Sequence, residues 1–100
     1  MKALWNDTVI AEAPKDALIR IEGNWYFPPA SVKREYFKDS DHRTTCIWKG
    51  EASYYDVVVD GDVNAFGAWY YAQPKEGSIE RVKADFTDFI AFWNGITVTE

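Results

Sequence analysis

The sequence predicts a mostly β fold with one or two short helices, in which antiparallel hairpins form a compact β-tent or barrel-like single domain over residues 1–100. Two observations carry this prediction. The chain has 100 residues, of which 47% are apolar and 17% aromatic, enough large side chains to build one core from few positions. Two-residue turn signatures also recur between runs of β-branched and aromatic residues, which suit a pleated, half-buried surface.

Four turn signatures divide the chain into expected hairpins: Asn6-Asp7, Gly23-Asn24, Asp60-Gly61 and Asn94-Gly95. Such pairs tolerate the positive φ angles of a type I′ turn, whose twist matches the flanking strands. Around Asp60-Gly61 we expect residues 54–59 and 63–71 to pair antiparallel, which brings Trp69 near Ser53.

Two segments predict short helices. Residues 30–37 follow Pro28-Pro29 and show helical spacing of their larger side chains, with Ser31 as the expected N-cap. Residues 78–86 place apolar side chains at helical spacing, with Ser78 as the expected N-cap. The stretch 38–43 is polar and aperiodic, and we expect a loop there.

Charge and composition exclude several classes of protein. Lys and Arg total 11 against 16 Asp and Glu, and the resulting net charge of −5 repels phosphate backbones, so no nucleic-acid partner is expected. The apolar stretches are too short for a membrane span. The N-terminal residues turn polar early and Cys46 is the single cysteine, which favours a cytoplasmic location. One Cys and one His exclude a Cys₄ or Cys₂His₂ zinc site, and no cofactor is expected.

Two weaker motifs have ordinary structural interpretations. Asp60 to Asn64 begins like a calcium loop, but Ala65 and Tyr71 stand where the loop needs Gly and Glu, so a hairpin turn is preferred. His42 is either a general base or a solvated loop residue, and the second interpretation is preferred.

Residues 44–55 carry the most chemistry. Strand alternation puts Cys46 and Lys49 on opposite faces unless a bend at Gly50 re-aims Lys49. Cys46 is either a small buried hydrophobe, the preferred interpretation, or a thiol nucleophile activated by Lys49 or His42.

The run from Thr45 to Tyr55, with its Cys-x-x-Lys-Gly-x-Ala-x-Tyr core, resembles the central signature of the bacterial domain-of-unknown-function family 427. The matching elements elsewhere are residues 25–28, residues 68–74, Ile79 and residues 89–93. The resemblance implies a tent-like fold of two antiparallel sheets meeting at an angle. The family is sometimes labelled a nucleotidyltransferase-like domain, although nothing in these residues supports that activity.

The resemblance places six residues on recurrent motif positions: Tyr26, Cys46, Lys49, Tyr54, Trp69 and Tyr70. A first hypothesis is an aromatic-lined pocket for a small molecule, bound by Tyr26, Lys49, Tyr54, Trp69 and Tyr70. Lys49 is its charged group and contacts the same ligand as Trp69, while Cys46 and Lys49 are the candidate catalytic residues.

The alternatives are an aromatic core without a site, and a non-catalytic protein-interaction module or homodimer. A nucleotidyltransferase ranks below both. Whether the protein is an enzyme stays open.

Overall fold

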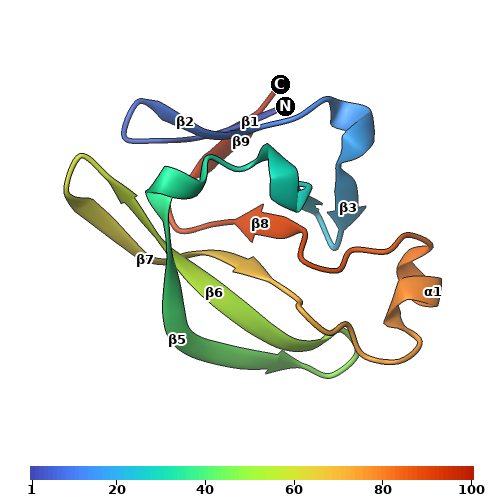
Figure 1. Cartoon of the computed structure of the whole chain (residues 1–100). Coiled ribbons are helices and arrows are strands. Elements are labelled where there is room, and N and C mark those ends of the chain that lie inside the picture. The colour runs from blue at the N-terminus through green and yellow to red at the C-terminus, as the bar shows by residue number, and fades with distance from the viewer.

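The computed structural model describes residues 1–100, and its first sheet joins the two ends of the chain. Strands β1 (Lys2–Trp5) and β2 (Thr8–Glu12) form a hairpin, and β9 (Thr97–Thr99) pairs with the other edge of β1 in the order β2-β1-β9. Asn6 and Asp7 have φ angles of 54° and 60°, which confirms the first expected turn. Lys2 pairs with Thr99, so the two termini lie side by side (Figure 1).

The second sheet is a small hairpin of β3 (Ile19–Ile21) and β4 (Asn24–Tyr26). Its turn consists of Glu22 and Gly23, with φ angles of 52° and 84°, while Asn24 already pairs with Ile21. The predicted turn at Gly23-Asn24 was therefore one residue too late. Glutamate is an unusual residue at positive φ, and a contact across the molecule, described below, involves its side chain.

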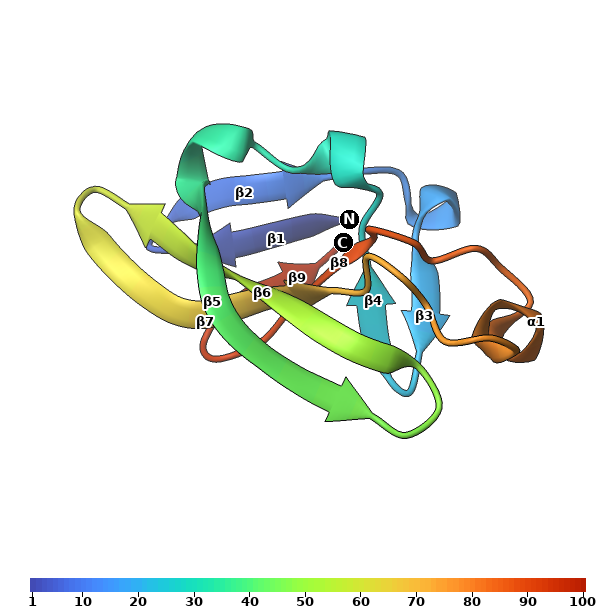
Figure 2. The same cartoon turned by 60° about the horizontal axis from the view of Figure 1, so that its bottom comes forward.

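The third sheet contains the long strands, in the order β5-β6-β7-β8. Their bounds are β5 (Phe37–Cys46), β6 (Gly50–Val59), β7 (Asp62–Tyr70) and β8 (Ile90–Phe92). Asp60 and Gly61 have φ angles of 51° and 83° and join β6 to β7 as predicted. Trp69 pairs with Tyr54, one position from the expected Ser53. Figure 2 shows how strongly the long strands β5, β6 and β7 curve.

A bulge in the β6–β7 pairing positions the β8 end of the sheet. The register shifts between Tyr55 and Val57, and the Asp56 carboxylate accepts a hydrogen bond of 3.0 Å from the Phe66 N–H, where φ is 59°. The Trp93 N–H donates to the Gly67 carbonyl at 3.1 Å, and the Trp93 indole donates to the Phe66 carbonyl. The bulge thus fixes the indole of Trp93 against the sheet.

Several local predictions were wrong or only partly right. Residues 38–43 are not a loop but part of β5, with a register shift between Asp39 and Arg43, because pairing with β6 overrides their polar composition. The expected helix at 30–37 is two 3₁₀ turns, η2 (Pro29–Ser31) and η3 (Arg34–Tyr36). Val32 between them is extended and bridges to Ala11, which prevents a continuous helix.

The remaining connections contain the other two predicted features. Helix α1 (Ser78–Val82) is shorter than the predicted 78–86; its N-cap is Gly77, and it stops at Val82 because the C-cap residue Lys83 has a φ of 67°. Asn94-Gly95 turns with positive φ but links β8 to β9, which belong to different sheets, so it is not a hairpin. A further 3₁₀ turn, η1 (Lys15–Ala17), precedes β3.

The core has two parts. The larger cluster packs side chains of the first sheet, such as Ile10, against side chains of the third sheet, such as Val57 and Ile90. The smaller cluster contains Ile21, Tyr26, Ala52, Tyr71, Phe86 and Ala91.

The mostly β, antiparallel prediction is confirmed. The strands form three open sheets rather than a closed barrel, and the tent description fits only loosely. No helix has the length and apolar character needed to cross a bilayer.

Candidate functional site

The loop of residues 47–49, between β5 and β6, turns Lys49 into the molecule. Gly50 has a φ of 108°, a conformation that L side chains rarely adopt, and a Cβ there would lie 3.2 Å from the Lys75 backbone nitrogen. The Lys75 N–H donates to the Lys49 carbonyl at 2.8 Å, and the Lys75 ammonium donates to the Ile47 carbonyl at 2.8 Å. These contacts leave Ile47 85% exposed and Lys49 only 7% exposed.

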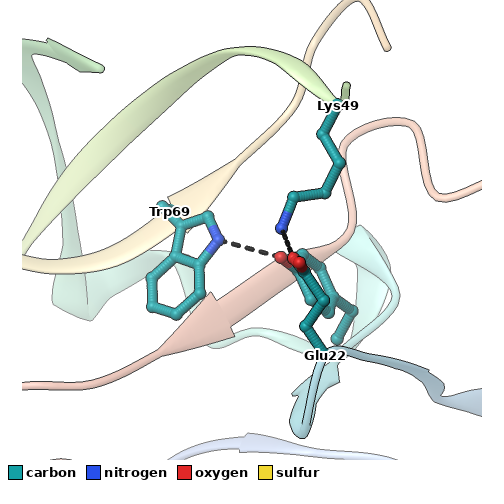
Figure 3. Close-up of polar contacts among 4 residues, drawn as sticks. Glu22, Lys49 and Trp69 are labelled. Carbon is teal, nitrogen blue, oxygen red and sulfur yellow. Dashed lines mark hydrogen bonds and ion pairs between the residues drawn. The ribbon is translucent and has the colours of Figure 1, made fainter. Parts of the chain in front are cut away.

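The Lys49 ammonium is charged and nearly enclosed. It donates a hydrogen bond to the Glu22 carboxylate, which reaches it from the β3–β4 turn (Figure 3). Burial disfavours the charged form and by itself lowers the pKa of Lys49. The hydrogen bond to Glu22 raises it, together with the charges around the ammonium, and the net pKa lies above its ordinary value. The Glu22 carboxyl, hydrogen-bonded by Lys49, has a lowered pKa. Lys49 therefore stays protonated at neutral pH.

Aromatic rings surround this cation. Its Nζ lies 5.4 Å from the ring centroids of both Trp48 and Tyr71, within cation–π range. Burial of the phenol, chiefly, raises the pKa of Tyr71 to about 12, so Tyr71 is a neutral hydroxyl at physiological pH.

Lys49 also lines a cavity of about 180 Å³ whose other walls are aromatic. Tyr54 and Trp69 come from paired positions of β6 and β7, Tyr71 follows β7, and Trp93 follows β8. The rings of these four residues form the rest of the lining. The cavity is open to solvent, and Trp93 in its wall is 50% exposed.

The orientation of Trp69 is fixed by a buried partner. Its Nε1–H donates to the Tyr26 hydroxyl at 3.0 Å, and the two rings meet edge to face at 6.1 Å. Trp69 also meets Trp93 edge to face at 6.2 Å. Because its N–H is already satisfied, Trp69 presents an apolar ring to the cavity. The result is a small site with aromatic walls and one buried ammonium, which is paired with Glu22.

The comparison with known protein families agrees with the resemblance in the sequence. The model of a family described as a domain of unknown function (DUF427) matches residues 1–99. The chain belongs to the DUF427 family. No curated protein matches this DUF427 chain.

The DUF427 structure brings some of the expected site residues together. Lys49, Tyr54 and Trp69 line one cavity. Tyr26 is fully buried; its hydroxyl meets the site through the Trp69 hydrogen bond and also lies within electrostatic reach of the Lys49 ammonium. Tyr70 lies on the other face of β7, where it stacks on Tyr55 at 4.7 Å, because successive residues of a strand point to opposite faces.

Cys46 and His42 lie outside the cavity lining. Cys46 is a free, half-buried thiol that packs against the smaller core cluster near Tyr71. His42 belongs to β5 rather than to a loop, and its ring stacks on Phe66 at 4.2 Å. No group of three or more His, Cys, Asp or Glu side chains is arranged to hold a metal ion.

Sequence reasoning did not assign Glu22, Tyr71 or Trp93 to the site. Alternation along β7 identifies Tyr71 once Trp69 faces the cavity, since the two are separated by one residue. Glu22 and Trp93 carry no comparable signal, because sequence-distant pairings bring them to Lys49 and Phe66.

Proposed function

We propose that this DUF427 domain binds a small anionic molecule with a flat apolar body in the Lys49 cavity. The observation that carries the proposal is a protonated lysine, 7% exposed, at the wall of a cavity whose other lining side chains are aromatic. Small-molecule sites are commonly built in this way, from apolar walls and a few polar groups that fix orientation.

The charge of Lys49 selects against cationic ligands. A cage of Trp and Tyr rings on its own suits a quaternary ammonium. Here the Lys49 ammonium already lies over Tyr71 at 5.4 Å, so a second cation in the cavity meets like-charge repulsion. An anion instead gains a charge-assisted hydrogen bond from Lys49 while its flat body packs on Trp69 and Trp93.

The cavity volume limits the size of the ligand. About 180 Å³ is below the roughly 300–1,000 Å³ of drug-sized sites and holds about six waters at ~30 Å³ each. A single ring bearing one carboxylate matches this volume. Because the pKa of Lys49 is raised, its amine is protonated at neutral pH and is a poor nucleophile. Lys49 therefore serves to bind the ligand rather than to react with it.

Three probes of nearly equal size test the proposal: benzoate, neutral benzamide and cationic benzylamine. Titration followed by two-dimensional ¹H–¹⁵N NMR should show benzoate binding with a dissociation constant on the order of 1 mM, typical of so small a ligand. The largest shifts should fall on Lys49 and on the indole N–H groups of Trp69 and Trp93. Benzamide should bind at least tenfold more weakly, and benzylamine should not bind.

Matched variants complete the test. Lys49→Met and Trp93→Ala should each abolish benzoate binding, whereas Lys38→Met, at an exposed position of β5, should leave it unchanged. Benzoate shifts that survive in Lys49→Met, or equal binding of benzamide and benzoate, would refute the anion site.

A second candidate function is protein interaction or homodimerisation through the same sheet. Three large apolar side chains on or next to this sheet are exposed: Val63 by 60%, Phe66 by 38% and Trp93 by 50%. Exposed apolar groups of this kind favour an interface. Sedimentation equilibrium distinguishes the two functions, because a dimer through this face should dissociate in Phe66→Ser and in Trp93→Ala but not in Lys49→Met.

A further inference from the structure

A second hollow, of about 290 Å³, lies between β3 and α1, which are neighbours in both views (Figures 1 and 2). Arg20 of β3 and Arg81 of α1 line it together with the apolar side chains of Ile21, Trp48 and Val82. Glu22 also lines it, and the charge of Glu22 is already matched by Lys49.

Aromatic rings rather than ion pairs orient the two arginines, although Arg81 lies near enough to Glu22 to help lower the pKa of that carboxyl. The Arg81 guanidinium lies 4.3 Å above the ring of Trp48, and the Arg20 guanidinium lies 4.7 Å above the ring of Trp25, its cross-strand neighbour. The ion pairs of the structure are Lys15–Glu100 and Lys49–Glu22, and neither guanidinium takes part in a hydrogen bond. Stacking orients a guanidinium and leaves its edge N–H groups free to bind a carboxylate in bidentate fashion.

A separate hollow of about 270 Å³ shares part of this lining. Trp48 and Arg81 line both hollows, and the second adds Ile47, 85% exposed, and Lys75. We call the set Arg20, Ile47, Trp48, Lys75 and Arg81 the basic groove. The basic groove carries three cations. Two acidic side chains also line the hollows: Glu76, and Glu22, which is paired with Lys49.

We propose that the basic groove binds an acidic peptide segment of a partner protein, independently of the Lys49 cavity. Charge complementarity is the main argument, because three cations gather here on a chain whose net charge is −5. Trp and Arg are also the residue types that most often dominate binding energy at protein interfaces. Ile47 and Trp48 offer apolar contacts between the cations, which an extended peptide of alternating acidic and apolar residues satisfies.

A fluorescein-labelled ten-residue peptide of alternating Glu and Leu is the probe, and its Lys and Leu counterpart is the charge control. Fluorescence anisotropy should show saturable binding of the acidic peptide that weakens as salt rises, and no binding of the basic peptide. Arg20→Gln and Arg81→Gln should each weaken binding about fivefold, the order expected for a single charged contact. Both positions are exposed, and melting temperatures measured in parallel show that the variants are folded.

Two control variants test whether binding is specific to the basic groove. Lys38→Gln removes the same charge on β5 and should leave peptide binding unchanged, as should Trp93→Ala in the Lys49 cavity. Equal weakening in Lys38→Gln, or no weakening in both arginine variants, would overturn the groove. Displacement of the peptide by inorganic phosphate at low millimolar concentration would assign the arginines to small oxyanions instead and would equally overturn the peptide assignment.

Discussion

The ammonium of Lys49 pairs with the carboxylate of Glu22, 27 residues earlier, and the two partners differ sharply in exposure. The side chain of Lys49 is 8% exposed and that of Glu22 is 53% exposed. Removing either partner therefore has unequal consequences, because only the lysine is left as a buried, unpaired charge.

We expect Glu22→Ala to destabilise the fold by roughly 1–3 kcal/mol, the cost of a buried charged donor without its acceptor. Lys49→Met should cost less than about 1 kcal/mol, because Met fills a similar space and the remaining Glu22 is hydrated. Urea unfolding monitored by tryptophan fluorescence measures both. Equal losses, or a larger loss for Lys49→Met, would contradict this asymmetry.

Stability should fall as the pH rises above 10. Burial raises the pKa of Tyr71 to about 12, so the folded state holds this proton more tightly than the unfolded chain, whose phenols titrate near ~10. The contribution of Tyr71 to the free energy of unfolding is complete below pH ~10. It is lost as the pH approaches 12, by up to about 1.4 kcal/mol per pH unit for one group. Tyr71→Phe should reduce this loss between pH 10 and 11.5 but not remove it, because burial also raises the pKa of Tyr26 and of Tyr70. If the stability–pH curves of wild type and Tyr71→Phe ran parallel, the loss of stability could not be assigned to Tyr71.

Two glycine substitutions should separate backbone strain from damage to the site. Gly50→Ala meets a φ of 108° and the Lys75 backbone at 3.2 Å, whereas Gly61→Ala meets a φ of 83° and no atom within 4 Å. We expect Gly61→Ala to cost about 1 kcal/mol and Gly50→Ala roughly 1–3 kcal/mol. Only Gly50→Ala should also weaken benzoate binding, since it displaces Lys49. If Gly61→Ala weakened binding equally, the loop geometry would not be the cause.

Metal chelation should leave the fold unchanged. The chain contains one Cys and one His, and no group of three metal-ligating side chains comes together. Circular dichroism and the melting temperature should be the same with and without excess EDTA. A drop in melting temperature that added zinc restores would show a site that these residues do not predict.

The parts of the fold that could be predicted are those determined by local chemistry. Asp60-Gly61 and its apolar flanks specify the β6–β7 hairpin. The predicted cross-strand partner of Trp69, Ser53, is one residue from the observed partner, Tyr54. The polar residues of β5 could not be predicted as a strand, because their pairing is decided by β6. Glu22 could not be assigned to the site for a similar reason, since its role depends on a hydrogen bond to Lys49 across the fold. The sequence motif predicts Tyr70 as a site residue beside Trp69, but alternation along β7 puts the two side chains on opposite faces of the sheet.

The pairing of Lys2 with Thr99 has a consequence for how the chain folds during synthesis. The three-stranded sheet can be completed only after β9 has left the ribosome, while the β6–β7 hairpin can form much earlier. Contacts between residues so far apart in sequence form more slowly than local contacts, because the entropy of loop closure must be overcome first. Until β9 arrives, one edge of β1 is unpaired and open to pairing with a neighbouring chain.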